Sequence, residues 1–259
     1  MNRKEIMIKL CKTELIVFIH IAKTGGTTLR NILNSQYPDN SIFLYMDKTN
    51  KKLVNEEKLL QLLQKHINSA KAISGHFGFE MKYEEIIQPL LPRIKKNRDI
   101  TYISMIRKPV DQIFSLFHHY KRNNWIASEI TFDMFVTNKL YQLNYQTLCI
   151  SGGNIPDIQQ AKKNITKDFA VLGVTDMYKE SLFLMKERFN WENKTYKKEN
   201  VFVNAFELTH ISSKIKQQIE QDNALDCQLY RFARSVLKKK IKKLDSYQKK
   251  ELITFSPFV

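Results

Sequence analysis

The sequence predicts an α/β fold in which a central parallel sheet is flanked by helices. Apolar runs of strand length recur along the chain, and segments with helical spacing separate them. The runs are nearly continuous, as expected for parallel strands that are buried on both faces. Three segments with unusual chemistry follow directly after three of these runs. Ligands of parallel sheets bind beyond the carboxyl ends of the strands, so this placement also favours an α/β arrangement.

Four strands are predicted from the apolar runs. They cover residues 15–20, 71–74, 100–106 and 169–174. Helices are predicted from the spacing of apolar residues and from start signals such as Asn55 and Pro109. These helices cover residues 28–36, 55–69, 110–122, 131–148, 158–165 and 176–189, and the last 50 residues form a mainly helical, strongly basic stretch. We expect residues 1–259 to form a single domain.

The composition is that of a basic globular protein. Hydrophobic residues make up 43% of the chain, which is enough for a core and excludes global disorder. Lys and Arg total 42 against 26 Asp and Glu, giving a formal charge of +16. This balance favours anionic partners, such as nucleotide phosphates, nucleic acid, acidic glycans or anionic lipid, without choosing among them. A generally lysine-rich composition explains most of the lysines equally well.

The cysteines and the apolar segments argue against several classes of protein. Cys11, Cys149 and Cys227 are widely spaced and form no CxxC pair, so neither a disulfide framework nor a zinc site is predicted. No apolar run approaches the length of a membrane span. Lys9 and Lys12 interrupt the apolar residues near the N-terminus, which therefore does not read as a signal peptide. We expect a cytoplasmic protein without an integral membrane segment and without a bound metal.

A loop with the chemistry of an anion cradle follows the first predicted strand. Residues 20–28 read HIAKTGGTT, so a strand leads in and a helix leads out. Lys23 supplies a cation, while Gly25 and Gly26 let the backbone curl and bring amide groups close to an anion. The start of the helix, with its free N–H groups and its dipole, also favours a phosphate. Three threonines add hydroxyls there: Thr24, Thr27 and Thr28.

This loop differs from the Walker A motif of kinases and ATPases. That motif places lysine after the second glycine, as GxxxxGK[ST]. Here Lys23 precedes Gly25 and Gly26, and the four-residue spacer is absent. A kinase reading is weakened, and it stays open as the alternative: an atypical nucleotide-dependent small-molecule kinase.

A second candidate anion site follows the strand at residues 100–106. Residues 107–115 read RKPVDQIFS. Arg107 offers a fork of donors suited to a phosphate, and Ser115 adds a hydroxyl about two turns into the next helix. Two anion sites on adjacent strand ends suit a nucleotide with separated phosphates better than one with a single contiguous chain.

Histidines near the strand ends are candidate bases. His76, in the segment ISGHFGFE at residues 73–80, has an ordinary pKa near neutrality and is suited to take a proton from a hydroxyl. Glu80 is a weaker rival base in the same segment. We interpret His20 as a structural group at a strand end, and His118 and His119 as helix residues.

The loop HIAKTGGTT carries a resemblance to a known family. It resembles the HIPKTGGT phosphosulfate loop of the sulfotransferases that act on carbohydrates, including the heparan sulfate 2-O and 6-O enzymes and their bacterial relatives. One departure is Ala22, which stands where the family usually has proline; we expect it to loosen the start of the loop without removing a ligand. The resemblance implies a P-loop-like three-layer sandwich. It also implies 3′-phosphoadenosine-5′-phosphosulfate (PAPS) as sulfuryl donor and the desulfated nucleotide PAP as product.

The second and third segments are similar to the same family. Arg107, Pro109 and Ser115 match its pattern at the 3′-phosphate site of the nucleotide. Lys108 and Gln112 depart from it, which affects local salt bridges more than the nucleotide site.

The resemblance also concerns the candidate base. A Gly-His pair carries the catalytic histidine in that family, and His76 matches it. The 2-O enzymes have a further histidine two residues earlier, where this chain has Ser74.

The resemblance implies a sulfotransferase that moves a sulfuryl group from PAPS to an acceptor hydroxyl, most naturally of a carbohydrate or glycoconjugate. His76 is expected to act as base in an in-line displacement, and Lys23 to stabilise charge on the bridging oxygen. No metal and no nucleic acid are expected to take part, and no oligomeric state is predicted. The run KKKIKK at residues 238–243 favours a different class, a non-enzymatic basic binding module. Interleaved aromatic residues are sparse there, so a solvated helix face is more economical.

Overall fold

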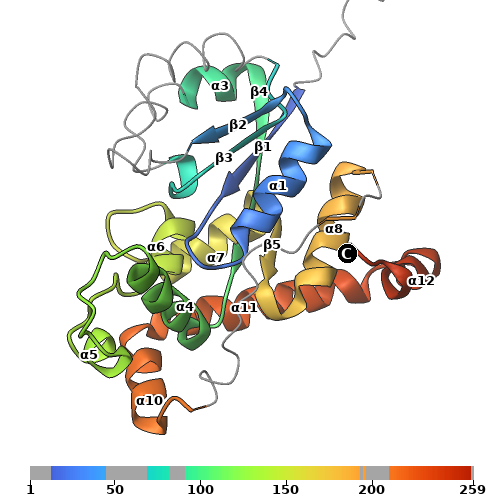
Figure 1. The fold of residues 1–259 in the computed structure, drawn as a ribbon. Coiled ribbons are helices and arrows are strands. Elements are labelled where there is room, and N and C mark those ends of the chain that lie inside the picture. The colour runs from blue at the N-terminus through green and yellow to red at the C-terminus, as the bar shows by residue number, and fades with distance from the viewer. Residues whose placement is uncertain (1–12, 45–68, 82–90, 193–194, 197–209, 258–259) are drawn as a thin grey trace, which may run out of the picture.

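The structure, a computed structural model, describes residues 13–44, 69–81, 91–192, 195–196 and 210–257. A five-stranded parallel sheet forms its centre, in the order β2-β3-β1-β4-β5 (Figure 1). The strands are β1 (Thr13–Ile19), β2 (Ser41–Leu44), β3 (Ala72–Gly75), β4 (Arg98–Ile106) and β5 (Phe169–Val174). Because all pairs are parallel, the carboxyl ends of the strands meet at one edge of the sheet.

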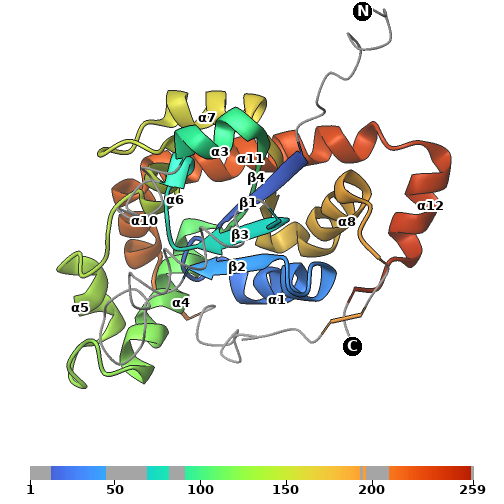
Figure 2. The ribbon, with the colours of Figure 1, turned by 90° about the horizontal axis from the view of Figure 1, so that it is seen from above.

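Helices cover both faces of this sheet, which confirms the predicted fold class. In Figure 2, α1 (Gly26–Gln36) and α8 (Tyr178–Phe189) lie on one side, and α3 (Leu91–Asn97) and α7 (Ile158–Lys167) on the other. A group of helices lies beyond the carboxyl edge of the strands in Figure 1: α4 (Pro109–Arg122), α5 (Phe132–Thr137), α6 (Tyr145–Ser151) and α10 (Ser213–Asp222). The chain continues into α11 (Ala224–Lys242) and α12 (Ser246–Thr254).

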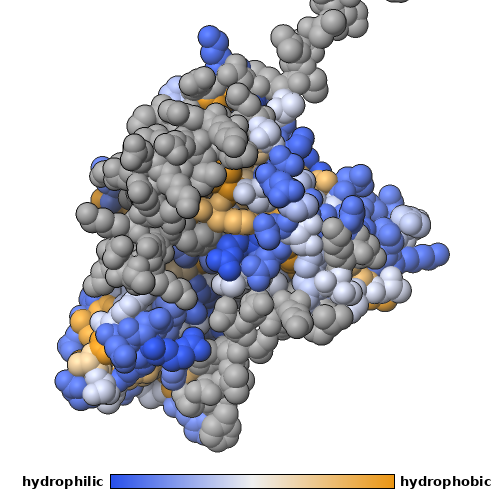
Figure 3. Space-filling model, turned by 45° about the horizontal axis from the view of Figure 1, so that its top comes forward, coloured by the Kyte–Doolittle hydropathy of each residue, from blue (hydrophilic) through white to orange (hydrophobic). Residues whose placement is uncertain are grey.

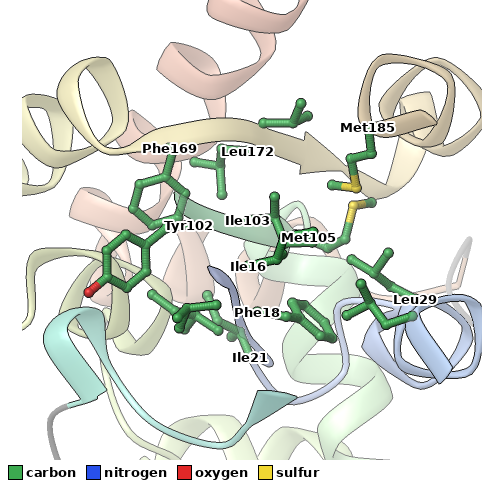
Figure 4. Close-up of a cluster of buried hydrophobic side chains, with 14 of the residues drawn as sticks. Ile16, Phe18, Ile21, Leu29, Tyr102, Ile103, Met105, Phe169, Leu172 and Met185 are labelled. Atoms are coloured by element: carbon green, nitrogen blue, oxygen red, sulfur yellow. The ribbon is translucent and has the colours of Figure 1, made fainter. Parts of the chain in front are cut away.

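The apolar core explains why the strand predictions succeed. Residues 15–20 are all buried, as a strand covered on both faces requires. Figure 4 shows Ile16, Ile103 and Leu172 from β1, β4 and β5 in one cluster, with Met185 of α8 approaching from a helix. A second, smaller apolar cluster joins α4, α5 and α10. Among the described residues, none of the helices has the length and apolar character that crossing a bilayer demands.

One predicted helix is wrong, and one strand was missed. The segment 131–148 forms two helices, α5 and α6, because the backbone takes positive φ at Lys139 (52°) and Asn144 (51°). Tyr141 in the intervening turn packs on Phe135 with ring centroids 5.5 Å apart. The short strand β2 lacks the long apolar run that marks the others. The predicted helix at 55–69 lies outside the described residues.

Candidate functional site

The three predicted segments converge at the carboxyl edge of the sheet. β1 lies between β3 and β4, so the residues that follow these three strands are neighbours. His20 follows β1, His76 follows β3 and Arg107 follows β4. Figure 3 shows hydrophilic surface in a hollow beside the lobe that contains α4 and α5, on the side toward which the strands point in Figure 1. The sequence prediction that these segments meet is confirmed.

The amino end of α1 is open to an anion. Gly25 occupies the N-cap position with φ 79° and has no side chain to cap the helix, and the first turn holds no acidic residue. The first amide groups of a helix lack partners within the helix, and the dipole adds positive potential there. Uncapped amides at a helix start form a natural phosphate site.

The three threonines of the loop differ in how deeply they are buried. Thr24 is fully buried, and its hydroxyl donates to the Ile21 carbonyl oxygen at 2.8 Å. This bond shapes the loop, so a contribution of Thr24 to anion binding would come through its backbone N–H. Thr28 is also buried, whereas Thr27 is half-buried at the start of the helix.

Each loop glycine is required by a specific neighbour. At Gly25 a Cβ would lie 2.8 Å from the Tyr178 ring, and the Tyr178 hydroxyl donates to the Gly25 carbonyl oxygen at 2.8 Å. At Gly26 a Cβ would lie 2.0 Å from Cδ2 of His20, which is too close for any side chain. The backbone therefore passes directly over the ring of His20. The role of Tyr178 was not predicted, since it approaches from α8 across the sheet edge.

Lys23 is a half-buried cation that forms no ion pair with the part of the chain that the structure describes. Its backbone has φ 65°, a left-handed conformation that is unusual for lysine and is often found at functional sites. Burial, followed by the nearby charges of Arg122 and Arg107, lowers the pKa of Lys23 to about 8. Among the described residues, no carboxylate forms an ion pair with Lys23 or Arg107. Two adjacent cations that no described carboxylate pairs with directly favour a bound anion.

Arg107 lies beside the loop, as the sequence predicts. Its Nη1 donates to the Lys23 carbonyl oxygen at 3.3 Å. Burial lowers the pKa of Arg107, and the negative charge of Asp111 opposes that shift. Gln112, one of the departures from the resembled family, donates from Nε2 to the Ala22 carbonyl oxygen at 3.0 Å. This bond ties α4 to the start of the loop.

Ser115 is placed less favourably for a ligand. It lies in α4, among the buried residues of that helix, and is only 4% exposed. Its predicted contact with a phosphate stays a prediction.

The ring of His76, the predicted base, is oriented by a hydrogen bond to the backbone of His20. Its Nδ1 lies 2.7 Å from the carbonyl oxygen of His20. A carbonyl oxygen only accepts, so Nδ1 carries the proton and Nε2 of the neutral ring keeps its lone pair. Burial of the ring is the main cause that lowers the pKa of His76; the hydrogen bond to His20 opposes it, and Arg30 adds to it. The residue as a whole is nevertheless exposed to solvent.

His20 is buried beside His76. The rings of His20 and His76 stack with their centroids 4.4 Å apart. The ring of Phe18 also stacks on His20, with the two centroids 5.3 Å apart. Burial, and then the charge of His76, lowers the pKa of His20 well below its ordinary value. A neutral His20 adds no repulsion to a protonated neighbour. The ring of His20 thus contacts both the ring of His76 and the backbone of Gly26, so it holds His76 close to the loop.

Glu80, the rival base, is turned to another part of the molecule. It forms an ion pair with Lys95 and lines a cavity of about 560 Å³ together with Tyr102 and Asn164. The lining comes from the first half of β4, the end of α6 and α7. None of the predicted loop residues lines this cavity. The geometry therefore favours His76 over Glu80.

His118 and His119 lie in α4, and the lysine run lies in α11. His118 packs edge-on against Phe114 and Phe117 within α4, and His119 packs against Trp125. The basic run at 238–243 ends α11.

Comparisons with known proteins yield only distant structural likenesses. No family model and no curated protein matches the chain. Mouse sulfotransferase SULT7A1, solved with PAP, is 19% identical; the match covers 93% of this chain and 83% of that one, with a TM-score of 0.46. A sulfotransferase from Alicyclobacillus acidocaldarius is 13% identical over 83% and 98% of the two chains, with a TM-score of 0.45. Retinol dehydratase with retinol and PAP is 11% identical over 81% and 80%, with a TM-score of 0.44. Likeness at this level assigns no activity to this chain.

Proposed function

We propose that this chain is a sulfotransferase that moves a sulfuryl group from PAPS to an acceptor hydroxyl. One observation carries the proposal: Lys23 and Arg107, both half-buried and neither in an ion pair among the described residues, lie beside the amino end of α1, whose N-cap is a glycine. A ligand with two separated anionic groups fits two adjacent cations and a helix start. PAPS is such a ligand, and the resemblance of the loop to the phosphosulfate loop of carbohydrate sulfotransferases agrees with it.

The residues of the chain have separate tasks in this proposal. The amides from Gly25 to Thr28 and the hydroxyl of Thr27 hold the 5′-phosphate end, and Lys23 places its ammonium at the oxygen on which charge develops. Arg107, with Ser115, holds the 3′-phosphate. PAPS supplies the sulfuryl group: its sulfur–oxygen bond to the phosphate breaks as the acceptor oxygen bonds to sulfur.

His76 handles the proton of the acceptor. Its Nε2 lone pair takes the proton of the acceptor hydroxyl while Nδ1–H stays bonded to the His20 carbonyl oxygen at 2.7 Å. A lowered pKa keeps His76 neutral, and so able to accept a proton, at neutral pH. We propose that the acceptor is a carbohydrate or glycoconjugate.

Titration of PAP in the absence of metal tests this proposal. Lys23→Ala and Arg107→Ala should each weaken PAP binding at least tenfold, because each removes a charge-assisted contact to a phosphate. Lys163→Ala, an exposed cation on α7, is the matched control and should bind as the wild type does. Failure of folded wild-type protein to bind PAP, or a metal-dependent preference for ATP, would refute the proposal and favour the kinase alternative.

The acceptor class requires a second measurement. Labelled PAPS would be offered with a panel of neutral and acidic oligosaccharides and with small apolar alcohols. Transfer to oligosaccharides is expected. Transfer to the apolar alcohols alone would keep the reaction and refute the acceptor class.

The affinity for PAP should depend on the charge of Lys23. Its pKa is about 8 in the ligand-free protein, and a bound phosphate favours the protonated form. The affinity for PAP should therefore be highest well below pH 8. It should fall by about tenfold between pH 7 and pH 9, because the free protein loses this proton over that range. Lys23→Arg keeps its charge over this range, so its affinity should stay flat. An equal fall in both proteins would exclude Lys23 as the cause.

A further inference from the structure

Gln146 forms hydrogen bonds to the backbone of Arg107 through both the oxygen and the nitrogen of its side-chain amide. Its Oε1 accepts from the Arg107 N–H at 2.8 Å, and its Nε2 donates to the Arg107 carbonyl oxygen at 2.9 Å. Gln146 is only 1% exposed. Two partly buried bonds of this kind fix the peptide groups on both sides of one residue, which sets the direction in which its side chain leaves the backbone.

The position of Arg107 between two elements makes these two bonds important for its orientation. Only Arg107 and Lys108 separate the end of β4 from the start of α4. Arg107 therefore belongs to neither element, and its own backbone groups would otherwise be free to turn. Its guanidinium reaches the Lys23 carbonyl oxygen at 3.3 Å, so a small rotation at the backbone would carry it away from the loop.

Gln146 is in turn held by a buried acid of α11. Asp226, 2% exposed, accepts from the Gln146 N–H at 3.1 Å, from the Thr147 N–H at 2.7 Å and from the Thr147 hydroxyl at 2.6 Å. This caps the amino end of α6 from another helix. Asn144, just before α6, caps the amino end of α11 in the same way. Its Oδ1 accepts from the Leu225 N–H at 2.9 Å and from the Asp226 N–H at 3.3 Å. Each helix start is thus capped by a side chain of the other.

We propose that Gln146 is a positioning residue. It holds the Arg107 guanidinium in the orientation that binds a 3′-phosphate, and it thereby sets the preference of the protein for nucleotides with this group. The inference rests on the proposed function. Its chain of contacts runs from α11 through Asp226 to α6, then through the Gln146 amide to Arg107. The 5′-phosphate site is built from the loop and the start of α1, and it joins these contacts through the bond from the Arg107 guanidinium to the Lys23 carbonyl oxygen.

The test compares PAP with AMP, because the two nucleotides differ only in the 3′-phosphate. Gln146→Met keeps the length of the side chain and removes both hydrogen bonds. It should weaken PAP binding about tenfold and change AMP binding by less than about twofold, so the ratio of the two affinities falls. Gln142→Met, at an exposed glutamine of the preceding turn, is the matched control and should leave the ratio unchanged.

A double-mutant cycle separates positioning from general damage. In an Arg107→Ala background, Gln146→Met should cause no further loss of PAP affinity, because there is no guanidinium left to aim. Gln146→Glu, which keeps an acceptor for the Arg107 N–H, replaces Gln146→Met in both comparisons if the latter does not fold.

Three outcomes are informative. A wild-type protein that binds PAP no better than AMP would overturn the proposed 3′-phosphate site itself. A normal wild-type preference that persists in folded Gln146 variants would overturn only the positioning role. Equal losses for PAP and AMP would show that Gln146 merely supports the fold, which also overturns the inference.

Discussion

His76→Gln should lower the turnover number for sulfuryl transfer by about 100- to 10,000-fold, the usual contribution of a general base. Glutamine can keep a hydrogen bond to the His20 carbonyl oxygen but cannot accept a proton at neutral pH. PAP affinity should change by less than about twofold, since His76 holds no phosphate in the proposal. The measurement is transfer from labelled PAPS to the first acceptor found, with His210→Gln, an exposed histidine before α10, as control.

The pH profile of the wild type gives an independent readout. The pKa of His76 is lowered from 6.5, so the base is neutral and competent at pH 7. The rate should fall only as the pH drops below 6.5 and the ring takes up a proton. Near-normal turnover of His76→Gln would contradict the role of His76 as base, and an acid limb that persists in that variant would assign the titration to another group.

Gly26→Ala should disable the loop although it adds only a methyl group. The new Cβ would lie 2.0 Å from the His20 ring, which is buried between Phe18 and His76 and has little room to move. Overpacking of this kind costs about 1–3 kcal/mol of unfolding free energy. We also expect a loss of PAP affinity of at least about tenfold, because a displaced backbone no longer presents its amides to the phosphate. Thermal unfolding and PAP titration measure the two effects.

The double variant His20→Ala/Gly26→Ala tests the cause. Removing the imidazole opens the space that the new methyl group needs, so PAP binding should recover in part relative to Gly26→Ala alone. Gly153→Ala is the control, because its Cβ would lie 3.2 Å from the Ile155 carbonyl oxygen and 3.8 Å from the Ile155 backbone nitrogen, which leaves room for the methyl group with at most a small shift. Normal PAP binding by Gly26→Ala would mean that the loop is not the phosphate site.

The candidate site shows how far local patterns reach. The order of residues from Lys23 to Thr28 predicts the anion loop, because a strand, a tight turn and a helix start are all encoded within a few positions. The hydroxyl of Thr24 was expected to face a ligand, yet it donates to Ile21 inside the loop. Both arrangements suit the same residue type, and only the packing decides between them.

The sequence by itself determined the parallel α/β architecture and the three segments at the sheet edge. Continuous apolar runs require burial on both faces, and parallel strands bring their carboxyl ends together whatever lies between them. The tertiary structure alone decided the break between α5 and α6, the stack of His20 on His76, and the link from Asp226 through Gln146 to Arg107. These features depend on contacts between residues as much as 80 positions apart, such as the bond from Gln146 N–H to Asp226. A long-range hydrogen bond leaves no periodic signal in the sequence, because neither partner is marked by its neighbours in the chain.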